Sequence, residues 1–249
     1  TVNWTPTLTN TVGAGSGTTI GLIDFTFNGA DLVDNTSMWA WKGYDNPMQG
    51  HGEAVASLLV SAHDGRGIMG IAPNAKVATF NPFDDTGTAS WDAVAAGLNT
   101  VNFSGARVVN LSLGVPGYAL HPDWNALYSR FDVAMLSKKT VFVHAAGNDG
   151  IAQTGNLAWN FANDPAMIVV GSVGPSGQIS AFSNTPGTTC LLNNGACLQQ
   201  NRLMNRFLVA PGEWILVSDG QGGVTRRSGT SFAAPQVTGA IALLQGRWS

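Results

Sequence analysis

The chain has 249 residues, of which 44% are hydrophobic and only 11% are charged, so we expect a large apolar core and exclude general disorder. A net charge of −3 without a dense run of Lys or Arg argues against a nucleic-acid partner. No apolar stretch approaches the roughly 20 residues that a membrane-spanning helix needs. The chain is therefore predicted not to be embedded in a membrane, although a parent protein could anchor it there.

Apolar strand patterns and helix patterns alternate along the chain, which is typical of a mostly parallel sheet with helices on both faces. The predicted strands are apolar nearly throughout and lie at residues 19–24, 76–80, 107–111, 140–145 and 167–173. The predicted helices lie at residues 52–60, 90–100, 122–138 and 231–244. In the third helix, apolar side chains recur at helical spacing at Trp124, Leu127, Tyr128, Phe131 and Met135.

Residues 174–206 are rich in Ser, Asn, Gly and Gln, and this composition predicts surface loops. After them, short antiparallel strands are predicted at residues 207–211, 214–217 and 224–227. No repeat or long linker divides the chain, so we expect residues 1–249 to form a single domain that a longer parent protein could contain.

The two cysteines, Cys190 and Cys197, lie seven positions apart within this loop-rich stretch. This spacing favours a small disulfide-bonded loop, and two cysteines alone do not make a four-ligand metal site. A disulfide indicates an oxidising compartment.

Ser231 begins a predicted helix whose inner face we expect to comprise Val237, Ala240, Ile241 and Leu244. The first N–H groups of a helix favour negative charge, so an oxyanion formed by attack of Ser231 would be stabilised there. A helix-capping role for Thr230 or Ser231 is the commoner use of such residues. Pro235 indicates a more specific role, because it removes a hydrogen bond to the Ser231 carbonyl at a cost of about 3 kcal/mol.

Residues 228–235, SGTSFAAP, resemble the nucleophile motif of the subtilisin-like serine proteases, peptidase family S8. The resemblance implies an Asp at the end of an early strand and a His that opens a helix. Asp24 and His51 stand at these positions, and the order Asp, His, Ser is the subtilisin order. The implied catalytic triad has Ser231 as nucleophile, His51 as general base and Asp24 as the carboxylate that orients it.

Residues 141–150 resemble the oxyanion segment of the same family, which implies that Asn148 donates its side-chain amide to the oxyanion. Without the resemblance, an Asn beside Gly147 would be interpreted as a turn residue. Residues 108–114 resemble the substrate-binding edge, to which an extended peptide adds as a strand. The substrate-contacting residues implied by the resemblance are Ser112, Leu113, Gly114, Gly87, Thr88, Ala89, Ala145, Ala146 and Gly147.

The remaining histidines, His63, His121 and His144, are interpreted as structural. Family members often bind calcium, but no complete loop of oxygen ligands surrounds the acidic pairs Asp31 with Asp34 and Asp84 with Asp85. We therefore expect no required cofactor or metal, and structural calcium stays an open alternative. Residues 156–165 align poorly with the family's floor of the primary specificity pocket, so the side-chain preference before the scissile bond is left open.

The resemblance implies an α/β fold of three layers, with a mostly parallel central sheet and helices on both faces. It also implies a monomeric serine endopeptidase of broad specificity that hydrolyses proteins through an acyl-enzyme, and that is secreted or held at a bacterial cell surface. The compact domain with its Cys loop also resembles protease passengers of bacterial autotransporters. Two alternatives are an inactive adhesion or binding module on a protease scaffold, and a serine esterase, which would have no use for a peptide-pairing edge.

Overall fold

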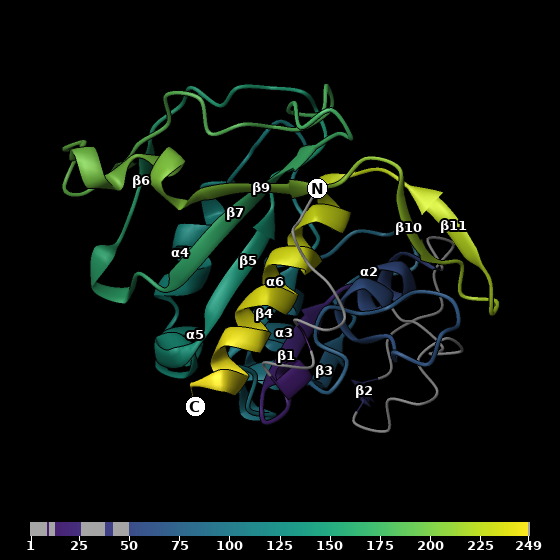
Figure 1. Cartoon of the computed structure of the whole chain (residues 1–249). Helices are drawn as coiled ribbons and strands as arrows, with labels where there is room; N and C mark the ends of the chain where they lie inside the picture. Colours follow the sequence, from purple (N-terminus) through teal and green to yellow (C-terminus); the bar gives the residue numbers. More distant parts are fainter. Residues whose placement is uncertain (1–8, 10–12, 26–37, 42–49, 249) are drawn as a thin grey trace.

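A seven-stranded sheet runs through the centre of the molecule (Figure 1). The computed structural model describes residues 9, 13–25, 38–41 and 50–248. All neighbouring strands of this sheet are parallel, in the order β2-β3-β1-β4-β5-β7-β9. Their bounds are β1 Thr19–Ile23, β2 Met38–Trp41, β3 Lys76–Phe80, β4 Val108–Leu111, β5 Val141–Ala145, β7 Ala166–Val173 and β9 Phe207–Pro211. The predicted parallel sheet is confirmed.

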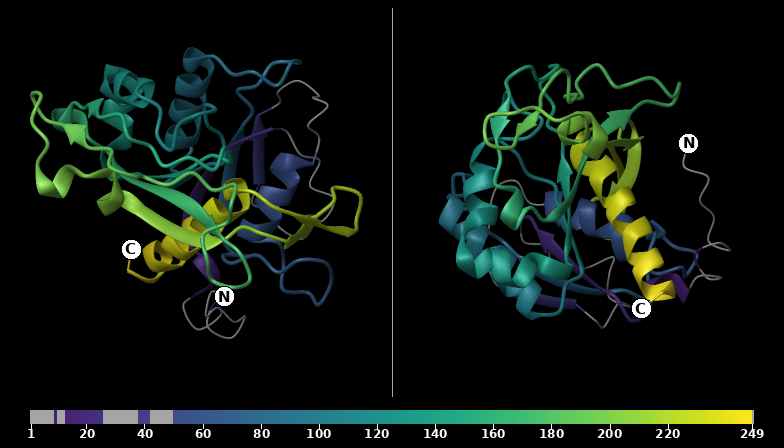
Figure 2. Two further views of the ribbon diagram at one scale, coloured as in Figure 1. Left: turned by 90° about the horizontal axis from the view of Figure 1, so that it is seen from above. Right: turned by 90° about the vertical axis from the view of Figure 1, so that its left-hand side faces the viewer.

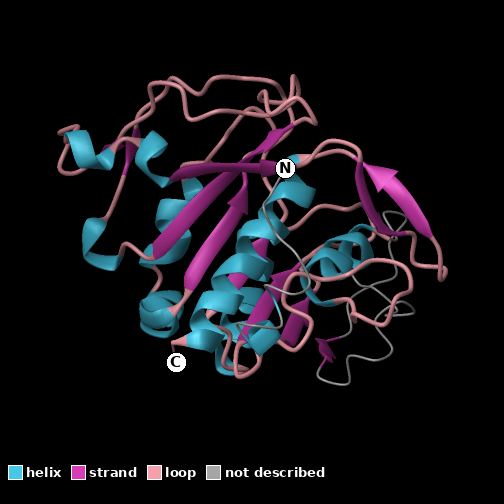
Figure 3. Cartoon of the chain, in the orientation of Figure 1, coloured by secondary structure: helices cyan, strands magenta, loops and turns pink. Residues whose placement is uncertain are grey.

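One predicted strand direction is wrong. Residues 207–211 were expected to be antiparallel, but β9 pairs in parallel with β7 at the edge of the sheet. The long loops between the two strands return the chain to the amino end of β7, so they serve as a crossover connection. The short strands β6 (Leu157–Ala158) and β8 (Leu191–Leu192) pair within these loops. The predicted antiparallel hairpin is present as β10 (Ile215–Ser218) and β11 (Val224–Arg227), which projects beside the main sheet (Figure 3).

The sheet separates two apolar cores, because successive side chains of each strand point to opposite faces. Ile20 and Leu22 of β1 pack in the core of α2 (His51–Val60) and α6 (Thr230–Arg247). Ile23 belongs to the core on the other face, which contains α3 (Trp91–Phe103), α4 (Asp123–Ser129) and α5 (Phe131–Leu136). The two helical layers enclose the sheet (Figure 2), and the predicted three-layer architecture is confirmed. Short 3-10 helices lie at Gly13–Gly15, Ser137–Lys139, Phe161–Asn163, Gln199–Asn201 and Leu203–Arg206.

The single helix predicted at residues 122–138 is wrong, because the chain forms α4 and α5 with a break at Arg130. Arg130 is extended, with φ −64° and ψ 136°, and its guanidinium pairs with two aspartates. The break changes which side of the second helix faces the core. Val133 is buried, whereas Phe131 and Met135 of the predicted apolar face are 81% and 53% exposed.

The predicted inner face of α6 is only partly correct, because Val237 and Ile241 pack against the core and Ala240 and Leu244 do not. Ala240 and Leu244 are exposed, while Val237 and Ile241 are only half-buried. The buried side is formed mostly by small residues, which are Ala233, Ala234, Thr238, Gly239 and Ala242. A Cβ on Gly239 would lie 2.8 Å from the Cβ of Ile71, so this close approach requires small side chains. Within the described ranges, neither α6 nor another helix is long and apolar enough to cross a membrane.

Cys190 and Cys197 form the predicted disulfide. Cys190 is buried beside β8, whereas Cys197 is exposed on the loop that the bond closes. The bond therefore ties the loop-rich segment to the core that contains Leu191.

Replacement of both cysteines by Ala is expected to lower the free energy of unfolding by about 2 kcal/mol, because closing a loop of this length restricts the unfolded chain. Urea unfolding followed by tryptophan fluorescence measures the change. Dithiothreitol should produce a similar loss in the unmodified chain and none in the double variant. Equal urea midpoints for the chain and the double variant would show that the bond does not stabilise the fold.

Candidate active site

The predicted site residues meet at the carboxyl edge of the central sheet. Asp24 follows β1 and Ser112 follows β4, which are neighbouring strands. Strand order runs from β1 through β3 in one direction and through β4 in the other, and ligand crevices form at such points in open parallel sheets. Asn148 follows β5, while His51 and Ser231 lie in the first turns of α2 and α6. Residues far apart in the sequence are thus brought to one crevice.

His51 forms a short hydrogen bond with a buried carboxylate. His51 Nδ1 lies 2.6 Å from Asp24 Oδ1, and the Phe25 N–H donates to the same oxygen at 2.7 Å. Since an ionised carboxylate can only accept, Nδ1 carries the proton. The neutral imidazole therefore presents Nε2 as a proton acceptor.

The pKa of His51 is set by burial, by Asp24 and by Arg227. Burial lowers this pKa, and the charge and hydrogen bond of Asp24 raise it. The positive charge of Arg227 lowers it. The net result is a His51 pKa above its usual value of 6.5.

Ser231 is held through its main chain by the end of β4. Pro235 has no N–H for the Ser231 carbonyl, and Ser112 Oγ donates to that carbonyl instead, at 2.8 Å. The hydrogen bond recorded for Ser231 Oγ is a long one, 3.4 Å, to the carbonyl of Ser112. Gly229 is the N-cap of α6 without a side-chain capping bond, so the capping interpretation of Ser231 is wrong.

The Ser112 hydroxyl belongs to a buried polar network. Asn110 Nδ2 donates to Ser112 Oγ at 2.8 Å, and Thr238 Oγ1 of α6 donates to Asn110 Oδ1 at 3.0 Å. Asn110 and Thr238 are fully buried. Because each group has a partner, the network fixes the direction in which the Ser112 hydroxyl points.

Asn148 is oriented by Thr230. Its Oδ1 accepts from the Thr230 N–H at 2.8 Å and from Thr230 Oγ1 at 3.0 Å, and Thr230 Oγ1 accepts from the Gly147 N–H at 3.1 Å. With Oδ1 so engaged, Nδ2 is the end of the amide left to donate. Gly147 has φ +90°, and a Cβ there would lie 2.5 Å from Asn184 Nδ2, so only glycine fits. The Ser231 N–H belongs to the first turn of α6, where N–H groups have no carbonyl partner within the helix.

Two adjoining cavities open at these residues. The larger, about 530 Å³, is lined by His51, Ser231, Asn148, Ser112, Leu113, Gly114, Gly87, Phe25, Phe83, Arg227, Ser228, Gly229 and Phe232. The smaller, about 240 Å³, is lined by Ser112, Leu113, Gly114, Val115, Pro116, Ala145, Gly147, Asn148, Asp149, Thr230 and Ser231. Ser112, Leu113 and Gly114, which follow β4, line both cavities.

Three of the predicted substrate-contacting residues lie outside both linings. Thr88 and Ala89 belong to the loop after Gly87. Ala89 forms an isolated antiparallel β-bridge with Phe83. Ala146 is fully buried in the core of α3 and α4. The remaining predicted contacts lie along one or both cavities.

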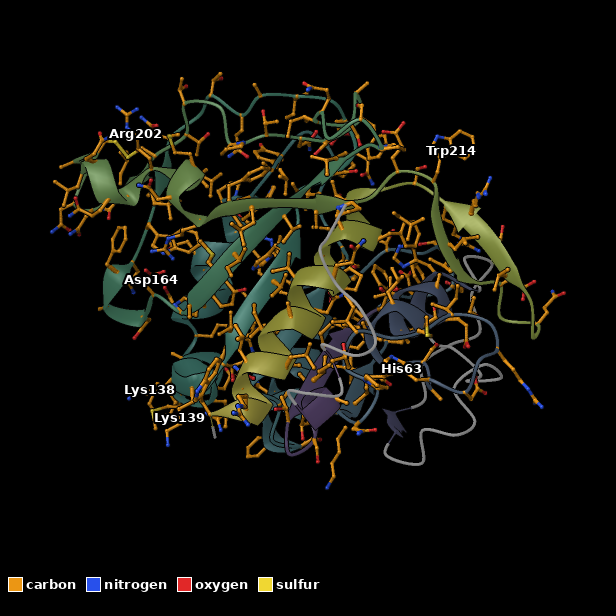
Figure 4. The ribbon with its side chains drawn as sticks, in the orientation of Figure 1. His63, Lys138, Lys139, Asp164, Arg202 and Trp214 are labelled. Carbon is orange, nitrogen blue, oxygen red and sulfur yellow. A yellow bond between two sulfur atoms is a disulfide. The ribbon has the colours of Figure 1, made fainter. Side chains whose placement is uncertain are left out.

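Residues 156–165 do not line either cavity. Trp159 is buried, and its Nε1 donates to Asp164, which pairs with Arg206 on the side of the molecule away from Trp214 (Figure 4). The unusual sequence of residues 156–165 therefore contributes to the core rather than to the cavities.

Asp149, which sequence reasoning did not single out, lines the smaller cavity in place of this segment. Its carboxylate accepts from Asn184 Nδ2 and from the Gly117 N–H, both at 3.0 Å, and these bonds lower the pKa of Asp149. Its position directly after Asn148 was the available signal.

The other histidines lie outside the two cavities. His144 is buried and bonds the hydroxyl of Tyr128 at 2.7 Å, and burial lowers the pKa of His144 to about 3. His63 bonds the Gly70 carbonyl in the loop after α2 (Figure 4), and His121 stacks on Trp91.

No metal site is evident in the part of the chain that the structure describes. The Asp84 carboxylate accepts hydrogen bonds from Thr86 and Thr88 of its own turn. The other acidic pair, Asp31 and Asp34, lies outside the described residues. Within the described ranges, no three His, Cys, Asp or Glu side chains are grouped as a metal site requires.

Comparison with known proteins gives consistent similarities. The family model for Peptidase_S8, the subtilase family, matches residues 15–248. Subtilisin DY of Bacillus licheniformis is 28% identical over 94% of this chain and 78% of its own length. Thermitase of Thermoactinomyces vulgaris is 28% identical over 95% of this chain and 78% of its own length. The structure of the prenylagaramide maturation protease PagA has 24% identity and a TM-score of 0.73, covering 96% of this chain and 80% of that one, and it shows similarity of fold.

The balance of charges at His51 predicts a measurable response to Asp24→Asn. The His51 pKa, followed by NMR, should lie above 6.5 in the chain and below 6.5 in the variant, because burial and Arg227 remain and both lower it. The buried His144 serves as an internal control that should not titrate between about pH 5 and 8 in either protein. An equal His51 pKa in both proteins would contradict the electrostatic role of Asp24.

Proposed function

This chain belongs to the subtilase family and is a serine endopeptidase, and we propose that Asp24, His51 and Ser231 are its catalytic triad. The observation that carries the assignment is the buried 2.6 Å Asp24–His51 hydrogen bond beside the cavity that Ser231 also lines. In subtilases this arrangement performs acyl transfer. The resemblance of residues 228–235 to the family's nucleophile motif supports the same assignment.

The proposed reaction begins when His51 Nε2 takes the proton of Ser231 Oγ as that oxygen attacks the scissile carbonyl. Asp24 stabilises the imidazolium that forms and keeps Nδ1 protonated. His51 then gives the proton to the leaving amine, and an ester of Ser231 remains. A water molecule, activated by His51 in the same way, hydrolyses the ester and restores the enzyme.

The proposed oxyanion hole consists of Asn148 Nδ2 and the Ser231 N–H. Thr230 occupies the Asn148 oxygen, which leaves the amide nitrogen as the donor. Both groups lie at the N-terminus of α6, where the helix dipole also favours negative charge. Because these donors are held before the reaction, they stabilise charge that appears only in the transition state.

The proposed substrate is an extended peptide that pairs with the main chain of Ser112, Leu113 and Gly114. These residues line both cavities, and a Cβ on Gly114 would meet no atom within 4 Å, so the edge is open. Main-chain pairing accepts many side chains, which supports broad specificity. The smaller cavity would take the side chain before the scissile bond, with room for basic side chains beside Asp149.

The proposed reaction uses only side chains and water, so we propose that it needs no cofactor. The disulfide supports a secreted or cell-surface location, because such bonds persist in oxidising compartments. We propose a monomer, because the proposed site needs no residue from a second copy of the chain. The relatives are proteases by name, so the inactive-module and esterase alternatives are not favoured.

Ser231→Ala and Asn148→Ala should have different kinetic effects on an amide peptide substrate. Loss of Ser231 should abolish turnover. Loss of Asn148 should lower kcat by about a hundredfold to a thousandfold with little change in KM, because its bond to oxygen forms in the transition state. Thr230→Val, which removes one anchor of the Asn148 oxygen, should give a smaller loss of kcat than Asn148→Ala.

An active-site serine reagent should label the unmodified chain and Asn148→Ala at one residue, Ser231, and should not label Ser231→Ala. Casein hydrolysis that survives in Ser231→Ala would refute the nucleophile. A raised KM with unchanged kcat in Asn148→Ala would refute the oxyanion role.

A further inference from the structure

Arg227 is the only Lys or Arg lining the cavity of His51 and Ser231 among the residues that the structure describes. It ends β11, four residues before Ser231. Its guanidinium Nη2 lies 3.2 Å from the point that a Cβ on Gly50 would occupy, and Gly50 precedes His51. A positive charge thus lies beside the first turn of α2.

Three main-chain contacts fix the position of the β10–β11 hairpin, which carries Arg227. Arg227 is paired with Ile215 across the β10–β11 hairpin. The Trp214 N–H donates to Ser228 Oγ at 2.9 Å where the chain enters the hairpin (Figure 4), and the Ser218 N–H donates to Ser57 Oγ of α2 at 3.1 Å. The hairpin is therefore fixed to the helix that carries His51.

The charge of Arg227 is not neutralised by any carboxylate in the described part of the chain. Arg130 and Arg206 both form ion pairs, whereas Arg227 forms none there. Its side chain is half-buried, while the neighbouring Arg226 is exposed, as expected for side chains on opposite faces of a strand. The two arginines therefore differ in their access to the cavity.

The side of the larger cavity that Arg227 lines would receive the leaving group. The acyl side of a substrate would follow Ser112 to Gly114 into the smaller cavity, and Arg227 does not line that cavity. His51 gives its proton to the leaving amine, and Arg227 is next to His51 and Gly50. The residues after the scissile bond would therefore pass Arg227.

We propose that Arg227 selects peptides with a carboxylate on the leaving-group side of the scissile bond. A guanidinium binds a carboxylate through two parallel charge-assisted hydrogen bonds. The carboxylate could belong to an Asp or Glu side chain, or to the C-terminus of a short peptide. The inference rests on the proposed function and names the substrate class of that same site.

The test uses peptides that are identical up to the scissile bond and continue with two residues of Glu, Gln or Lys, each followed by an amidated end. A further Gln peptide ends at the second of these residues as a free acid. The unmodified enzyme should cleave the Glu peptide with a kcat/KM about tenfold above the Gln peptide, or about 1.4 kcal/mol, and the Lys peptide should be the poorest. A preference for the free acid alone would assign the site to chain ends.

Variants at two neighbouring arginines isolate the effect. Arg227→Gln should remove the Glu preference, Arg227→Glu should reverse it toward Lys, and Arg227→Lys should retain part of it. The exposed Arg226→Glu has the same change in net charge and should leave the ratios unchanged. Equal Glu and Gln rates in the unmodified enzyme, or equal effects of Arg226→Glu and Arg227→Glu, would overturn the proposal.

A second readout is the pH profile of a small ester without residues after the scissile bond. The charged groups that act on His51 are Asp24 and Arg227. Arg227→Gln should raise the apparent pKa of kcat/KM, because it removes the charge that lowers the His51 pKa, and Arg226→Gln should not. Cleavage by Ser231→Ala would refute the proposed function, whereas an inactive Ser231→Ala with flat peptide ratios would refute only the role of Arg227.

Discussion

The site depends on the hydrogen bond from Ser112 Oγ to the Ser231 carbonyl. Pro235 leaves that carbonyl without its helical donor, and an unsatisfied carbonyl at a buried helix end is costly. The donor comes from the end of β4, so one contact fixes the proposed peptide-binding edge next to the proposed nucleophile. Asn110 and Thr238 limit the Ser112 hydroxyl to this direction. Pro235 thus lowers the local stability of α6, and it leaves the Ser231 carbonyl free to bond Ser112 at the end of β4.

A second constraint is the balance of charges around His51. A buried imidazole without a neighbouring carboxylate is a weak base, as the pKa of about 3 at His144 illustrates. Asp24 more than offsets burial at His51, and Arg227 counteracts part of that effect. Asp24 therefore raises the His51 pKa above its usual value, and Arg227 limits that rise. The same arginine lines the larger cavity, so the proposed selectivity would be coupled to the basicity of His51 through one side chain.

The sequence alone predicted the features that local patterns determine, such as buried strands and the disulfide-bonded loop. The strand predicted at 19–24 is apolar from residue 20 to residue 23, and the Cys190–Cys197 loop follows from spacing. The errors arise where tertiary contacts decide. Ion pairs of Arg130 accompany the break in the expected helix at 122–138, and return of the loops at 174–206 sets the direction of β9. On α6 the predicted inner face was Val237, Ala240, Ile241 and Leu244, but close packing of Gly239 against Ile71 places small residues on much of the buried side.

The site residues likewise fall into those that a sequence motif predicts and those that only the fold reveals. Four side chains were recognisable because a motif names them, and their chemistry depends on geometry that the fold brings together. Asp149 lies in the recognised oxyanion segment without an assigned role, and Arg227 directly precedes the nucleophile motif, because their roles depend on which cavity each side chain lines. One is negative on the proposed acyl side, and the other is positive on the proposed leaving-group side. A cleft with this polarity would orient a peptide whose charges are opposite at its two ends, before any side-chain pocket is filled. Main-chain pairing alone cannot select those charges, because it accepts many sequences.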